Sequence, residues 1–149
     1  MGACGLYCFC GSSQCAKSAS SAMKDWWAYT LVFLGGGTGS IARFLLSQLF
    51  NNKSAVFHWG TFSANMIGCL LIGLFIPLLS KNPPSSFLLL AVAGFCGGFT
   101  TLSTLSWESL KLLEKHGISI YLLYVGLTII VGLLLTYGGY RLALQLLKA

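Results

Sequence analysis

The chain has 149 residues, of which 56% are hydrophobic and 8% are charged, and its mean hydropathy is +0.79. A soluble domain carries about 25% charged residues, so this composition excludes an ordinary soluble protein and indicates the membrane class. The net charge is +6, with only three acidic residues and two histidines. These groups are too few and too scattered for most hydrolytic chemistry. We therefore expect neither an enzyme nor a nucleic-acid partner.

Four stretches are long and apolar enough to cross a bilayer, which requires about 20 mostly apolar residues each. They are Trp26–Phe50, His58–Leu79, Phe87–Leu113 and Ile118–Leu147. Almost nothing remains for a soluble domain. The prediction is an all-α membrane protein, a compact bundle of four transmembrane helices formed by residues 23–149.

The positive charges are spread almost evenly over the two sides of this bundle. One side would hold Lys17, Lys24, Lys81, Arg141 and Lys148, and the other Arg43, Lys53, Lys111 and Lys115. The positive-inside rule orients helices by such a bias, and a bias of five against four is very small. We therefore hypothesise dual topology, in which oppositely inserted copies pair as an antiparallel dimer.

Residues 1–22 differ from the rest and are interpreted as a disordered or misannotated N-terminal extension. They contain Cys4, Cys8, Cys10 and Cys15 among small polar residues. Metal binding is the alternative, but the paired C-x₂-C spacing of zinc sites is missing. Met23 would make a natural start.

The most informative stretch is Gly94–Glu108, which reads GFCGGFTTLSTLSWE. Its three glycines are expected to mark either a break in the helix or a very close crossing. A break frees backbone carbonyls, which coordinate cations in transporters. Thr100, Thr104 and Glu108 follow at four-residue spacing, with further hydroxyls beside them. Hydroxyl-rich, broken backbone at membrane depth survives only inside protein or along a polar pathway, although back-bonding to the preceding turn is the simpler explanation of the hydroxyls.

The first helix contains the sequence LGGGTGSIARF. Gly35 and Gly39 form a small-xxx-small pair that lets another helix approach closely. Arg43 lies too deep to be a simple flank. It is interpreted as a snorkelling arginine, an anion-attracting vestibule residue or a cap on backbone carbonyls.

The second and fourth helices each carry polar residues at depth. Asn65 either links helices by hydrogen bonds or presents its amide donors to an anion, and the sequence does not decide between these roles. Pro77 is expected to end the hydrophobic part of the second helix. Tyr124 and Thr128 give the fourth helix a thin polar stripe.

Three motifs, GGGTGSIARF, WGTFSANMIG and GFCGGFTTLSTLSWE, resemble the CrcB/Fluc family of small fluoride channels. The resemblance runs from about Met23 to the C-terminus. It implies a fluoride-selective channel that lowers cytoplasmic fluoride by passive export. It also implies a dual-topology antiparallel homodimer with a broken third helix, two fluoride pathways and a structural sodium ion that is not transported. The protein would lie as a multi-pass protein in the cell membrane, the inner membrane in a Gram-negative cell, in contact with lipid.

The resemblance also assigns individual residues. It implies that the backbone carbonyls of Gly97 and Thr100 hold the sodium ion and that Arg43 is the first-helix arginine of the family. The implied fluoride pathway consists of Asn65, Thr101, Ser103, Thr104, Glu108, Tyr124 and Thr128. Glu108 is expected near the mouth, either protonated or bonded to a hydroxyl.

The chain departs from the family where two aromatic residues would be expected edge-on to the ion. It has Leu102 and Leu105 there, and leucine lacks the positive ring edge that can face an anion. Three interpretations stay open: altered conduction, one half of a heterodimer with a paralogue, or a non-conducting copy. The rival functions are a non-transporting scaffold and a small dual-topology proton-coupled multidrug exporter, which would need a first-helix carboxylate that is absent after Asp25.

Overall fold

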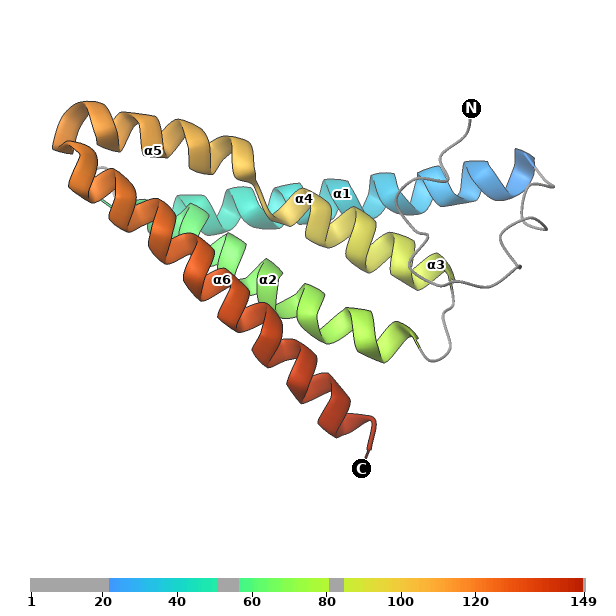
Figure 1. Cartoon of the computed structure of the whole chain (residues 1–149). Helices are drawn as coiled ribbons and strands as arrows, with labels where there is room; N and C mark the ends of the chain where they lie inside the picture. The colour runs from blue at the N-terminus through green and yellow to red at the C-terminus, as the bar shows by residue number, and fades with distance from the viewer. Residues whose placement is uncertain (1–21, 51–56, 81–84, 149) are drawn as a thin grey trace.

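The computed structural model describes residues 22–50, 57–80 and 85–148, and these residues are almost entirely helical. The predictions for the N-terminal extension and for the two loops at 51–56 and 81–84 lie outside them. In chain order the elements are α1 (Ala22–Phe50), α2 (Trp59–Ser80), α3 (Ser85–Leu88), the π-helix η2 (Leu89–Cys96), α4 (Gly97–Phe99), α5 (Leu102–His116) and α6 (Ile118–Leu146). Figure 1 shows α1 running beside the α3–α4 segment, and α2 beside α6.

The four predicted spans are confirmed to within a few residues. The described segments long and apolar enough to cross a membrane are Trp26–Phe50, Trp59–Leu78, Ser86–His116 and Ile118–Leu146. The third of these spans includes α4 and α5 as well as η2. The chain is therefore an all-helical protein with four membrane-capable segments.

Glycines bring α1 and η2 into backbone contact, as the Gly35–Gly39 pair predicts. A Cβ atom added to Gly35 would overlap the Leu90 carbonyl oxygen, and one added to Gly39 would overlap the Phe95 carbonyl oxygen. From the other side, Gly98 lies against the backbone of Gly36. No side chain larger than hydrogen fits at these points, so the sequence fixes how closely α1 crosses the third span.

A second glycine contact joins α2 and α6. A Cβ on Gly73 would overlap the Thr136 carbonyl oxygen, and a Cβ on Gly139 would lie 2.7 Å from the Leu70 carbonyl oxygen. Thr136 strengthens this crossing because its hydroxyl donates to the Cys69 carbonyl at 3.1 Å. Close backbone approach of this kind is how membrane helices associate without a hydrophobic driving force between them.

Pro77 lies one residue before Leu78, where the membrane-capable stretch of the second helix ends, as predicted to within one residue. It lies buried inside α2, which continues to Ser80. A proline removes only the bond to the carbonyl four residues earlier, here that of Gly73. Transmembrane helices tolerate this loss when neighbouring elements compensate, and α6 crosses α2 at Gly73.

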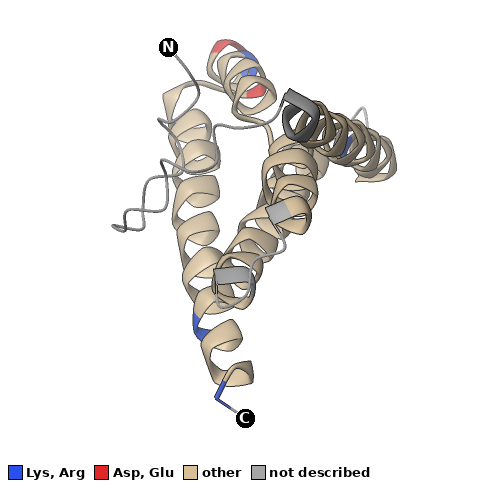
Figure 2. Cartoon of the chain, turned by 90° about the vertical axis from the view of Figure 1, so that its right-hand side faces the viewer, with Lys and Arg blue, Asp and Glu red and all other residues tan. Residues whose placement is uncertain are grey.

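Charged residues are rare on the described helices. Figure 2 shows that most of the ribbon is uncharged, and Glu108 and Glu114 both belong to α5. This distribution leaves the apolar sides of α1, α2 and α6 suited to lipid.

Candidate functional site

The third span loses its helical conformation at Thr100 and Thr101. Thr100 has φ −83° and ψ 152°, and Thr101 has φ −151° and ψ 117°, both in the extended region. Helical backbone continues through Gly94, Gly97 and Gly98. Of the two roles expected for the glycines, close crossing therefore applies to Gly94 and Gly98, and the two extended residues come after them.

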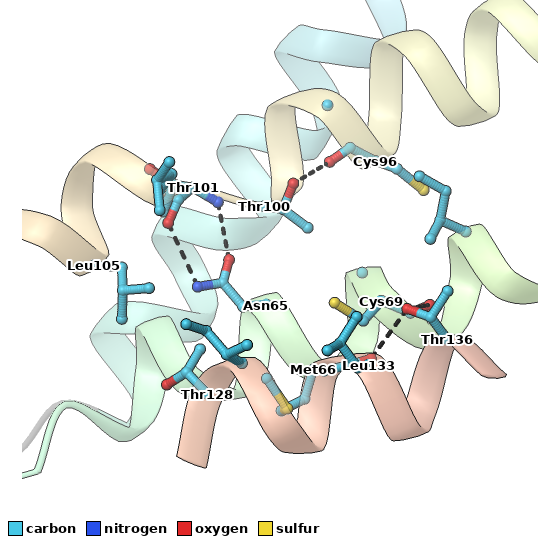
Figure 3. Close-up of a pocket in the computed structure, with 16 residues that line it drawn as sticks. Asn65, Met66, Cys69, Cys96, Thr100, Thr101, Leu105, Thr128, Leu133 and Thr136 are labelled. Atoms are coloured by element: carbon cyan, nitrogen blue, oxygen red, sulfur yellow. Dashed lines mark hydrogen bonds between the residues drawn. The ribbon is translucent and has the colours of Figure 1, made fainter. Parts of the chain in front are cut away.

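Asn65 of α2 holds this extended pair by both ends of its amide. Its Oδ1 accepts from the Thr101 N–H at 2.9 Å, and its Nδ2 donates to the Thr101 carbonyl at 3.4 Å (Figure 3). Only 8% of the Asn65 surface is exposed. Asn65 therefore links α2 to the third span, which is one of the two roles that the sequence left open. The second N–H of its amide remains for another acceptor.

In a continuous helix, the carbonyls of Gly97 and Thr100 would each accept a hydrogen bond from an N–H group that donates elsewhere in this structure. A helical Thr101 N–H would bond the Gly97 carbonyl, but it donates to Asn65 instead. A helical Thr104 N–H would bond the Thr100 carbonyl, but it donates to the Thr101 hydroxyl at 3.3 Å. Thr101 thus caps the start of α5, and the carbonyls of Gly97 and Thr100 are released from the helical pattern.

The Gly98 carbonyl, next to these two, accepts hydrogen bonds from α1. The donors are the Ser40 hydroxyl and the Arg43 Nε, each at 3.4 Å. Arg43 is half-buried. Among the roles considered for Arg43, carbonyl capping is the one that this geometry supports.

Glu108 lies buried where α2, α5 and α6 meet. Its two carboxylate oxygens accept from the Thr61 hydroxyl at 2.8 Å and from the Tyr124 hydroxyl at 2.9 Å. Glu108 is 7% exposed, and Thr61 and Tyr124 are almost fully buried. Of the two states expected for Glu108, bonding to hydroxyls is observed, and it involves two helices.

Thr61 is a site residue that sequence analysis missed because it lies near the start of α2. Its spacing of four residues from Asn65 was the available signal, since residues i and i+4 share one helix face. Tyr124 and Thr128 are both buried on α6, which confirms the polar stripe predicted there.

The hydroxyl groups fall into two kinds. Those of Thr100 and Thr128 donate to carbonyls one turn back, at 2.9 and 2.7 Å, which is the back-bonding that also explains such residues in ordinary membrane helices. Thr101, Ser103 and Thr104 instead bond one another, at 3.1 Å for Thr101–Ser103 and 3.2 Å for Thr101–Thr104. A hydroxyl of the second kind can turn its proton toward a ligand by giving up a bond to another hydroxyl, without breaking a bond to the backbone.

Thr100, Thr101 and Thr128, but not Ser103 and Thr104, border a groove of about 420 Å³ between α2, the third span and α6 (Figure 3). Asn65, Gly97, Thr100, Thr101 and Thr128 line it together with apolar side chains. Leu102 also lines it and is 75% exposed, whereas Leu105 is buried against Tyr124. The structure brings most of the predicted site residues to this groove, while Glu108 and Tyr124 lie in the buried cluster beside it and Arg43 lies behind it on α1.

Within the residues that the structure describes, no cluster of three or more His, Cys, Asp or Glu could hold a metal ion. A site made of backbone carbonyls is of a different kind, because it requires no such side chains.

Four membrane-capable helices around a buried polar site define a multi-pass membrane protein. Residues 30–140 match the family described as "CrcB-like protein, Camphor Resistance (CrcB)", and the chain belongs to this family. It is 42% identical over 106 residues to a "Fluoride-specific ion channel FluC" of Phocaeicola vulgatus, covering 70% of this chain and 88% of the relative. Proteins of the same name from Flavobacterium psychrophilum (41% over 118 residues; 77% and 95% covered) and Gloeothece citriformis (50% over 102 residues; 66% and 80% covered) are also similar.

Proposed function

We propose that this chain is a subunit of a fluoride-selective channel that exports fluoride passively across the cell membrane. Two lines of support converge. The relatives named above are fluoride-specific channels. The observation from the molecule itself is the extended pair Thr100–Thr101, where the Thr101 backbone bonds the Asn65 amide and the Thr101 hydroxyl bonds those of Ser103 and Thr104. A multidrug exporter or a scaffold would not require this cluster.

Hydrogen-bond donors are what fluoride needs, because it is small and holds its water tightly. A channel replaces an ion's hydration shell with closely spaced lining groups. Asn65, Ser103 and Thr104 offer donors that need little rearrangement. Thr128 and Tyr124 offer donors already used inside the protein, so the ion would have to displace those bonds. Glu108 would lie beside this pathway, where the Thr61 and Tyr124 hydroxyls donate to its carboxyl oxygens.

The open groove supports an antiparallel homodimer. Polar groups and extended backbone at membrane depth cannot face lipid, yet the groove exposes Thr100, Thr101 and Leu102 along one side of the subunit. A second copy inserted with the opposite orientation would cover it, and the near balance of positive charge permits both orientations. A paralogue carrying aromatic residues at positions 102 and 105 would cover the groove equally well, which makes a heterodimer the second possibility.

We further propose that the third span is one broken transmembrane helix and that the break holds a structural sodium ion. The residues fit such an ion, because the carbonyls of Gly97 and Thr100 have lost their helical donors to Asn65 and Thr101. In a dimer, each copy would contribute its Gly97 carbonyl and its Thr100 carbonyl. The cation would offset the charge of nearby anions in a low-dielectric interior. The chain's own contribution is to keep the carbonyls free of other donors.

Efflux from liposomes tests the proposal directly. Purified protein is reconstituted in vesicles loaded with potassium fluoride or potassium chloride, and release is followed with ion-selective electrodes after a potassium ionophore is added. Fluoride release well above that of empty vesicles, without chloride release, is expected. Equal release of both ions, or none, would contradict a fluoride channel. Repeating the assay after prolonged dialysis against sodium-free buffer separates the sodium proposal from the channel proposal.

A further inference from the structure

A second groove lies between α2 and α6 and adjoins the groove of the polar site, with which it shares Ile72, Leu133 and Thr136. Its volume is about 290 Å³, and it is lined by residues that include Gly73, Ile76, Leu133, Tyr137 and Tyr140. Ile76 is 47% exposed and Leu133 is 67% exposed. Such a groove on a membrane protein can hold an acyl chain.

The positively charged side chain of Arg141 lies at one end of this groove, against the ring of Tyr137. The Arg141 Nη1 donates to the Tyr137 hydroxyl at 3.2 Å, and the guanidinium lies 5.9 Å from the centre of the Tyr137 ring. Arg141 is exposed. A guanidinium has five N–H donors in a planar fork that matches phosphate, so the bond to Tyr137 orients the group and leaves most of its donors for a ligand.

The position of Arg141 along α6 matches the headgroup layer. It lies 23 residues after Ile118, the first residue of α6, which is about 35 Å at 1.5 Å per residue. The hydrocarbon core is about 30 Å thick. Tyr140 directly precedes Arg141 and Tyr137 sits one turn inside, where aromatic side chains gather in membrane proteins. Neither α2 nor α6 contains an acidic residue that would compete for the guanidinium.

We propose that this groove is a binding site for an anionic phospholipid. Its acyl chain would lie against Ile76 and Leu133, and its phosphate would bind the Arg141 guanidinium. The charge of Arg141 and the apolar lining together require a ligand that is anionic at one end and apolar along its length. The apolar half of this site adjoins the ion groove at Leu133, whereas Ile76, Tyr137 and Tyr140 do not line that groove. The proposal requires only that the chain lies in a membrane and not that it conducts fluoride.

Lipid binding can be measured by native mass spectrometry on purified protein with phosphatidylglycerol or phosphatidylcholine added at matched concentrations. The wild-type protein is expected to retain phosphatidylglycerol preferentially. A basic residue near an anionic membrane surface contributes about 1 kcal/mol, which corresponds to about fivefold. Arg141→Gln should therefore lower the preference for phosphatidylglycerol about fivefold. Lys111→Gln is the matched control, because Lys111 also lies over an aromatic ring, that of Trp107 at 4.8 Å, but on α5.

The acyl half of the site is tested by filling the groove. Ile76→Trp should reduce retention of both lipids several-fold, whereas Ile67→Trp should not, since Ile67 is comparably exposed (42%) on the same helix and lies outside the groove. Equal phosphatidylglycerol preference in wild type and Arg141→Gln would overturn the proposal, as would an equal loss in Lys111→Gln. If Ile76→Trp instead separated a dimer into monomers, a second copy would be the occupant and the lipid proposal would be wrong.

Discussion

The side-chain amide of Asn65 pairs with the main chain of Thr101 much as one strand residue pairs with another, accepting from its N–H and donating to its carbonyl. This pairing occurs between two helices, at the point where the backbone of the third span becomes extended. One side chain thereby substitutes for the helical partners that Thr101 lacks. It also determines which carbonyls remain available nearby.

Asn65→Ala is expected to loosen this segment. The Thr101 N–H would lose its acceptor, and leaving a buried donor unpaired costs about 1–3 kcal/mol. Amide hydrogen exchange at Thr101 should accelerate about tenfold or more, while exchange in the middle of α6 should not change. Thr30→Ala is a suitable control, because the Thr30 hydroxyl only bonds the Trp26 carbonyl one turn back on an exposed face. Unchanged exchange at Thr101 would show that Asn65 does not hold the extended pair Thr100–Thr101.

Thr61→Val is expected to destabilise the protein, because it removes one of the two hydroxyl donors to the buried Glu108 carboxylate. The loss should be about 1–3 kcal/mol and should appear as a lower midpoint of thermal unfolding in detergent. Thr61→Ser retains the hydroxyl and should restore most of the stability. Thr38→Val, on an exposed part of α1, should have little effect. A midpoint for Thr61→Val equal to that of Thr38→Val would argue against the cluster.

Gly39→Ala and Gly37→Ala should differ sharply although they are two residues apart. The new methyl group at position 39 would overlap the Phe95 carbonyl oxygen, which is backbone and cannot move aside cheaply, whereas nothing lies within 4 Å of the one at position 37. Overpacking costs about 1–3 kcal/mol, and alanine otherwise favours a helix over glycine by about 1 kcal/mol. Thermal unfolding should therefore show a loss for Gly39→Ala and no loss for Gly37→Ala. Equal behaviour would mean that α1 and η2 are not in backbone contact.

Leu102→Phe should be accepted readily, because 75% of the Leu102 surface is exposed at the edge of the groove. Leu105→Phe should cost about 1–3 kcal/mol through overpacking, because Leu105 is buried against Tyr124. If an aromatic edge helps an anion to pass, Leu102→Phe should raise fluoride efflux several-fold per protein. Efflux unchanged from wild type would indicate that hydroxyl and amide donors suffice in this chain.

Features that depend on local pattern could be predicted from the sequence. Hydrophobic length gave all four spans, and the spacing of Gly35 and Gly39 gave a close helix crossing that the Leu90 and Phe95 carbonyls confirm. The glycine-rich, hydroxyl-rich stretch after Gly94 contains the two residues at which the backbone becomes extended. These signals depend on periodicity and on residue size, both of which are visible in one sequence.

Features that depend on a partner from another helix could not be predicted in this way. The extended residues are Thr100 and Thr101, not the glycines, because Asn65 supplies the hydrogen bonds from α2. The spacing of Thr61 from Asn65 placed both on one face of α2, but its partner, Glu108 of α5, is visible only in the folded structure. In each case tertiary contacts outweigh local preference.

The central claim is that Asn65 and the extended Thr100–Thr101 pair form the conducting core of a fluoride channel. The most direct test compares fluoride efflux from liposomes that contain equal amounts of wild-type protein or Asn65→Ala. The account predicts fast, chloride-free fluoride efflux for the wild type and a loss of at least tenfold for Asn65→Ala. Efflux from Asn65→Ala at the wild-type rate would contradict it.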